Sequence, residues 1–146
     1  MRQNDMQAEA IMISTYCGII KKILNEYKVL SLYKAITFAY ILKKNEYQFN
    51  DIYNGHNNID VVNKCLSQLT GAFSDYCDNL PFILKALHIL IKNNIIDFNT
   101  KELVIIPLDS PQLPTKSNLN FFINKAIEES KKVSDRQFLK EVMYNV

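Results

Sequence analysis

The sequence predicts a mainly helical fold with one small β-hairpin. The 146-residue chain has only four Pro and three Gly, and so few turns favour helices over a many-stranded sheet. Apolar residues recur at helical spacing along most of the chain. Two short apolar segments, 95–98 and 102–106, depart from that spacing and indicate strands joined by a tight turn.

Four helices are expected before the hairpin, over residues 6–26, 31–45, 60–76 and 79–92. Ser31 is the predicted N-cap of the second helix. Asn79 is the predicted N-cap of the fourth, with Pro81 tolerated in its first turn. A long helix followed by a hairpin is the layout of a winged helix. We therefore predict a winged-helix-like domain over residues 1–108.

A linker with C-terminal helices is predicted over residues 109–146. Its prolines indicate a stiff, extended segment, and two amphipathic helices follow, at 119–132 and 135–144. Ser134 and Gln137 fit a capping box for the second of these helices. The two helices either lie in a groove of a partner protein or fold back on their own domain. The sequence favours neither alternative.

Composition and charge exclude several classes of protein. The net charge is +2 and only two residues are Arg, so sequence-specific reading of DNA bases, which relies mostly on Arg, is disfavoured. Three cysteines without a CxxC pair do not form a secreted disulfide framework. No secretory signal or membrane-length apolar run is recognisable. We expect a cytoplasmic protein without membrane contact.

No catalytic or cofactor motif is present in the sequence. It lacks a phosphate-binding loop, a dinucleotide fingerprint, a nucleophile elbow and a zinc-protease motif. His56 and His88, the only histidines, match no zinc spacing, and Asp75 and Asp78 are expected to be solvated residues at a helix end. We expect no enzyme, cofactor, metal or small-molecule substrate. A hidden active site would be sought first at Cys77, His56 and Asp75.

Apolar surface is therefore the best candidate for function. The helix over 81–92 is apolar nearly all round, so it is either central to the core or covered by a partner. Three lysines are candidate phosphate contacts for weak, non-specific binding of DNA: Lys85, Lys92 and Lys101. The residues predicted to bind a partner protein are Phe82, Leu84, Ile91, Phe98, Phe121, Phe122, Phe138 and Leu139.

Several apolar segments in residues 6–108 carry a family resemblance. They are Leu32-Tyr33-Lys34-Ala35 leading to Tyr40-Ile41-Leu42-Lys43, the stripe of Leu66 and Leu69, and Leu84 to Ile91 running into Asn94-Ile95-Ile96 and Leu103-Val104. In this order they resemble the middle component of bacterial ABC three-component systems, which include Lamassu-type anti-phage defence. The resemblance implies a kleisin-like or kite-like subunit without catalysis, which bridges an SMC-like ABC ATPase and an effector nuclease. The alternative is a winged-helix transcription regulator that binds DNA.

Overall fold

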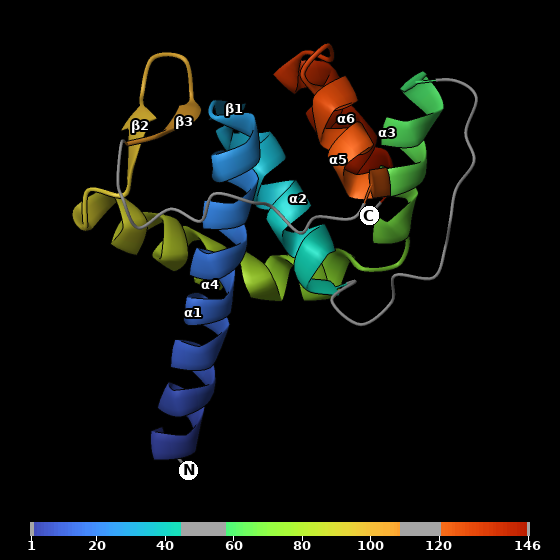
Figure 1. The fold of residues 1–146 in the computed structure, drawn as a ribbon. Helices are drawn as coiled ribbons and strands as arrows, with labels where there is room; N and C mark the ends of the chain where they lie inside the picture. Colours follow the sequence, from blue (N-terminus) through green and yellow to red (C-terminus); the bar gives the residue numbers. More distant parts are fainter. Residues whose placement is uncertain (1, 45–57, 109–120, 146) are drawn as a thin grey trace.

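The computed structural model describes residues 2–44, 58–108 and 121–145, and it confirms a mainly helical fold with a small antiparallel sheet. The elements are shown in Figure 1 and are, in chain order, α1 (Arg2–Tyr27), β1 (Leu30–Ser31), α2 (Leu32–Lys44), α3 (Asn58–Leu66), the 3-10 turn η1 (Ser67–Leu69), α4 (Phe73–Lys92), β2 (Ile96–Asn99), β3 (Val104–Pro107), α5 (Phe121–Ser130) and α6 (Asp135–Asn145).

The hairpin is widened by a strand that the sequence analysis missed. The sheet order is β1-β3-β2, and all neighbours are antiparallel. β1 spans only two residues, Leu30 and Ser31, which pair with Ile105 and Val104. So short a strand has no periodicity of its own and forms only because β3 lies beside it. The segment between α1 and α2 is thereby attached to the hairpin.

The predicted boundary between the third and fourth helices is wrong. The helix predicted over 60–76 ends early, because Gly71 adopts a positive φ of 75° and turns the chain. α4 then begins at Phe73 and continues through Asn79 and Pro81. Asn79 is therefore a buried residue within α4 and does not cap it.

A polar network explains why α4 starts so early. The Asn79 side-chain amide donates to the Asp75 carbonyl at 2.8 Å, and its side-chain oxygen accepts from the Tyr16 hydroxyl at 2.8 Å. The Asp75 carboxylate accepts from the Tyr40 hydroxyl at 2.5 Å. These bonds join α1, α2 and the first turns of α4. Tertiary contacts thus stabilise a helical segment that the sequence pattern assigned to a break.

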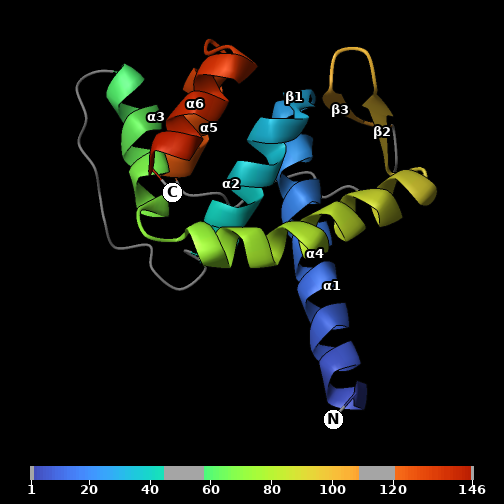
Figure 2. The same cartoon turned by 180° about the vertical axis from the view of Figure 1, so that it is seen from behind.

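The two C-terminal helices fold back on the rest of the chain. α5 packs on α3, and α6 packs on α2 and α3 (Figures 1 and 2). Their apolar faces belong to the same core cluster as the other helices, through Ile123, Ala126, Ile127, Phe138 and Val142. The structure therefore resolves the alternative that the sequence left open, in favour of docking within the chain.

Polar contacts from α1 and α2 hold the α5–α6 pair at its edges. Lys34 is only 6% exposed, and its ammonium group donates to the Val133 carbonyl at 2.6 Å. Lys131 donates to the Tyr27 carbonyl at 2.9 Å, and the Tyr27 hydroxyl donates to the Asn124 carbonyl at 2.9 Å. Because these side chains are long and partly buried, they tie the last helices to the core without leaving buried polar atoms unpaired.

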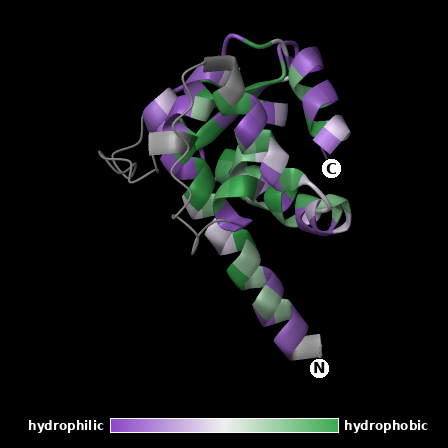
Figure 3. Cartoon of the chain, turned by 90° about the vertical axis from the view of Figure 1, so that its right-hand side faces the viewer, coloured by the Kyte–Doolittle hydropathy of each residue, from purple (hydrophilic) through white to green (hydrophobic). Residues whose placement is uncertain are grey.

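The N-terminal turns of α1 extend away from the body of the protein (Figures 1 and 3). Residues 4–8 are exposed, and Glu9 forms an ion pair with Lys85 of α4. Further along α1, Tyr16, Ile20, Ile23 and Leu24 are buried where the helix crosses the others. In the part of the chain that the structure describes, no helix has the length and apolar character needed to cross a bilayer.

Candidate functional site

An apolar groove lies between α4 and the hairpin. It has a volume of about 190 Å³ and is lined by residues of α2, α4, β2 and β3. Three of the predicted partner-binding residues meet there: Leu84 and Ile91 from α4, and Phe98 from β2. These three residues were predicted from hydrophobicity alone, and the fold brings them to one site.

Helical and strand periodicity together create this groove. Leu84, Leu87 and Ile91 recur at three- and four-residue intervals, so they share one face of α4. Phe98 and Ile105 are directly paired across β2 and β3 and therefore point to the same face of the sheet. The α4 face and the sheet face are apposed because α4 leads directly into β2.

The groove has a buried floor and a partly exposed rim. Leu87 and Ile105 are 5% and 1% exposed and form the floor. Ile91 and Phe98 are half-buried and pack against the core. Leu84 is 50% exposed at the rim. Covering an exposed leucine beside an apolar depression with another apolar surface stabilises the complex by about 25 cal/mol per Å² of apolar surface removed from water.

Polar groups that could carry out catalysis do not gather in the groove. His88 is the one titratable residue in its lining, where no carboxylate or thiol accompanies it. Among the described residues, no group of three or more His, Cys, Asp and Glu side chains is placed to bind a metal ion.

Two of the three residues suggested for a hidden active site, Asp75 and Cys77, lie on α4. His56 lies outside the described residues. Cys77 is exposed on α4. Asp75 is exposed, as predicted, but it lies in the first turn of α4 and not at the end of the third helix, and its carboxylate accepts the hydrogen bond from Tyr40. Asp78 is exposed.

The three candidate phosphate contacts differ in their surroundings. Lys85 is ion-paired with Glu9 of α1. Lys92, in the last turn of α4, and Lys101, in the hairpin turn, are both exposed. The Lys101 backbone N–H donates to the Asn99 side chain at 2.9 Å, which fixes the turn. Acidic Asp97 and Glu102 lie in the same hairpin, so the surface around the groove is of mixed charge.

The remaining predicted contact residues lie elsewhere. Phe138 is fully buried, and its ring centroid lies 5.6 Å from that of Phe38, so this chain itself covers it. Leu139 is half-buried on α6, and Phe82 is half-buried against the core. The side chains of Phe121 and Phe122 lie outside the described residues.

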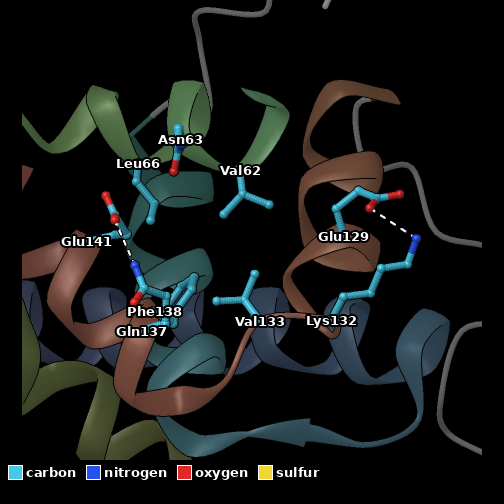
Figure 4. Close-up of a pocket in the computed structure, with 9 residues that line it drawn as sticks. All are labelled: Val62, Asn63, Leu66, Glu129, Lys132, Val133, Gln137, Phe138 and Glu141. Atoms are coloured by element: carbon cyan, nitrogen blue, oxygen red, sulfur yellow. Dashed lines mark hydrogen bonds and ion pairs between the residues drawn. The ribbon is translucent and has the colours of Figure 1, made fainter. Parts of the chain in front are cut away.

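A second hollow, which sequence reasoning did not find, separates α3 from the α5–α6 turn (Figure 4). Its volume is about 330 Å³. Val62 and Leu66 of α3 face Val133 and Phe138 across it. No sequence signal indicates where two packed helices leave space between them.

No protein-family model matches this chain, and no curated protein or solved structure matches it.

Proposed function

We propose that this chain is a non-catalytic interaction subunit that binds an apolar segment of a partner protein in the groove between α4 and the hairpin. The observation that carries the proposal is the convergence of Leu84, Ile91 and Phe98 beside a buried floor, with Leu84 half-exposed. Groove binding of this kind places a few apolar anchors in a depression and surrounds them with polar contacts.

The sequence resemblance supplies the identity of the partners in this proposal. The chain would bridge an SMC-like ABC ATPase and an effector nuclease of a Lamassu-type anti-phage system. We place it in the cytoplasm, where its three free cysteines stay reduced. The docked α5–α6 pair is part of the folded body in this proposal, and the α4–hairpin groove is the main contact surface.

Co-purification with the products of the neighbouring genes tests the proposal. The informative variant is Leu84→Asp, because this side chain is half-exposed and its replacement leaves the core intact. The matched control is Met143→Asp, which introduces the same charge at an exposed apolar position on α6. We expect the control to bind normally and Leu84→Asp to weaken binding roughly tenfold or more, since a carboxylate would be buried against apolar groups.

Two results would count against this proposal. If the native chain does not bind the neighbouring ATPase or effector, the bridging role fails. If Leu84→Asp binds them as tightly as Met143→Asp does, the groove is not the contact surface.

Binding to DNA is the second candidate function, favoured by the position of α4 directly before the hairpin and by exposed Lys92 and Lys101. A gel shift that compares the protein's own promoter with random duplex distinguishes the two functions. A regulator prefers its promoter, whereas phosphate contacts alone give weak binding that falls steeply with salt. The mixed charge around the groove leads us to expect no promoter preference.

A further inference from the structure

The cavity between α3 and the α5–α6 turn has the composition of a small-molecule site. Its volume of about 330 Å³ lies at the lower end of the range for ligand pockets. Val62, Leu66, Val133 and Phe138 form apolar walls that face one another (Figure 4). Pockets between packed helices with mostly apolar walls and a few polar groups are common ligand sites.

Polar groups occur at two opposite ends of this cavity (Figure 4). At one end, Lys132 forms an ion pair with Glu129, with 3.2 Å between the ammonium nitrogen and a carboxylate oxygen. At the other end, the side-chain amide of Gln137 donates to a carboxylate oxygen of Glu141 at 2.9 Å. The first end is therefore neutral overall, whereas the second pairs a carboxylate with an uncharged amide.

The two ends of the cavity therefore differ in net charge. Glu129 is mostly buried, with 16% of its side chain exposed, and it is already neutralised by Lys132. Glu141 is half-buried, and one of its oxygens accepts from Gln137, which leaves the second oxygen to accept from a ligand. A ligand whose apolar body fills the cavity and whose cationic head reaches Glu141 would match both shape and charge.

We propose that the cavity between α3 and the α5–α6 turn binds a small amphipathic amine, with its apolar body between Val62 and Phe138 and its ammonium group on Glu141. Such a ligand would contact both α3 and α6 and would link the C-terminal helices to the body of the protein. The site is separate from the α4–hairpin groove, so it stands or falls independently of the proposed partner binding.

Tryptamine is a suitable probe, because it combines a flat apolar ring system with one ammonium group. Two compounds with the same ring serve as controls: tryptophol, in which a hydroxyl replaces the amine, and indole-3-propionate, which is anionic. Binding to the intact chain is followed by the amide shifts of α3 and α6 in NMR titrations up to about 10 mM, as is usual for fragment-sized ligands. At about ten times its Kd, tryptamine is expected to raise Tm by about 4–5 °C.

Two variants assign the binding to this cavity. Glu141→Gln keeps the side chain's size and removes its charge, and we expect tryptamine affinity to fall about fivefold with tryptophol affinity unchanged. Asn63→Trp replaces an exposed residue at the cavity's edge with a side chain large enough to block part of the cavity. That variant should fold normally by circular dichroism and lose binding of all three compounds. Glu102→Gln, in the hairpin, is the matched control for charge loss and should bind as the native chain does.

Tryptamine should therefore bind about fivefold more tightly than tryptophol, and indole-3-propionate should bind least. The proposal is overturned if tryptamine causes no saturable shifts at α3 and α6. It is equally overturned if the anionic compound binds as tightly as tryptamine, or if Glu141→Gln and Asn63→Trp leave tryptamine affinity unchanged.

Discussion

Replacing Phe138 by alanine tests whether the last two helices share one cooperative core with the rest of the chain. The Phe138 side chain is 0% exposed on α6, and its ring packs at 5.6 Å and 42° against Phe38 of α2. Removing a buried phenylalanine ring costs about 3–5 kcal/mol, from lost transfer free energy and from the space that remains. Domains of this size have a total stability of about 5–15 kcal/mol, so the loss would be a large fraction.

Urea unfolding followed by circular dichroism at 222 nm measures this loss. With a dependence of about 2 kcal/mol per M urea, a 4 kcal/mol loss moves the midpoint down by about 2 M. Met143→Ala, on the same helix but 66% exposed, is the matched control and should change stability by less than about 0.5 kcal/mol.

The number of unfolding transitions in urea tests whether the chain has a single core. One core predicts a single transition that shifts as a whole. If Phe138→Ala instead gives two transitions, the first melting α5 and α6 and the second at the native midpoint, then residues 109–146 unfold as a separate unit and the single-core interpretation fails.

Three further predictions concern titratable and polar groups. Burial raises the pKa of Tyr27, with Glu128 and Glu26 adding to the effect. Below pH 10 tyrosine is protonated in both the folded and the unfolded chain, so the stability from this residue is fully present there. Above pH 10 the unfolded chain loses the proton first, and the free energy of unfolding falls by up to about 1.4 kcal/mol per pH unit from this residue. Tyr27→Phe should reduce the alkaline loss in unfolding curves measured from pH 9 to 11.5 without abolishing it, because burial also raises the pKa of Tyr16 and Tyr40; an unchanged slope would contradict the assignment. At pH 8, Ellman's reagent should modify exposed Cys77 rapidly. Cys65 is buried, and burial raises the pKa of its thiol to about 12, so it should react only on unfolding. A fast phase that remains in the Cys77→Ser variant would refute this. Asn79→Ala should cost about 1–3 kcal/mol because it leaves the buried Tyr16 hydroxyl unpaired, and adding Tyr16→Phe should recover part of the loss; a fully additive double variant would argue against the bond.

Local signals in the sequence were reliable where a side chain acts on its own backbone neighbourhood. Ser31 caps α2, and its hydroxyl accepts from the Lys34 N–H at 3.3 Å. Ser134 caps α6, and its hydroxyl accepts from the Gln137 N–H at 3.1 Å. The reciprocal half of that capping box is replaced, because the Gln137 side chain donates to Glu141. The hairpin was also found, shifted by one or two residues.

Prediction from the sequence failed where residues distant in the chain determine the local structure. Asn79 and Pro81 look like a helix start, but Tyr16 of α1 and Tyr40 of α2 stabilise the preceding turns through Asn79 and Asp75. β1 exists only because it pairs with β3.

The candidate sites were predicted in part. Leu84, Ile91 and Phe98 were proposed from hydrophobicity and do meet at the groove. Phe138 was proposed on the same grounds and is buried, because hydrophobicity does not distinguish a surface that binds a partner from one that the chain covers itself. The cavity beside α3 depends on how helices far apart in sequence fit together, and no local pattern reports that.

The hairpin turn also sets the conditions under which a partner would bind. Leu103 adopts a positive φ of 55°, and its carbonyl accepts from the Leu32 N–H at the start of α2 at 2.8 Å. The turn is thus anchored to a helix at its base as well as paired across the sheet, and Leu32 and Phe98 keep their positions at the groove. A preorganised depression of this kind spares an incoming segment the entropic cost of ordering the receptor, so affinity would depend mainly on the conformational freedom that the partner itself gives up.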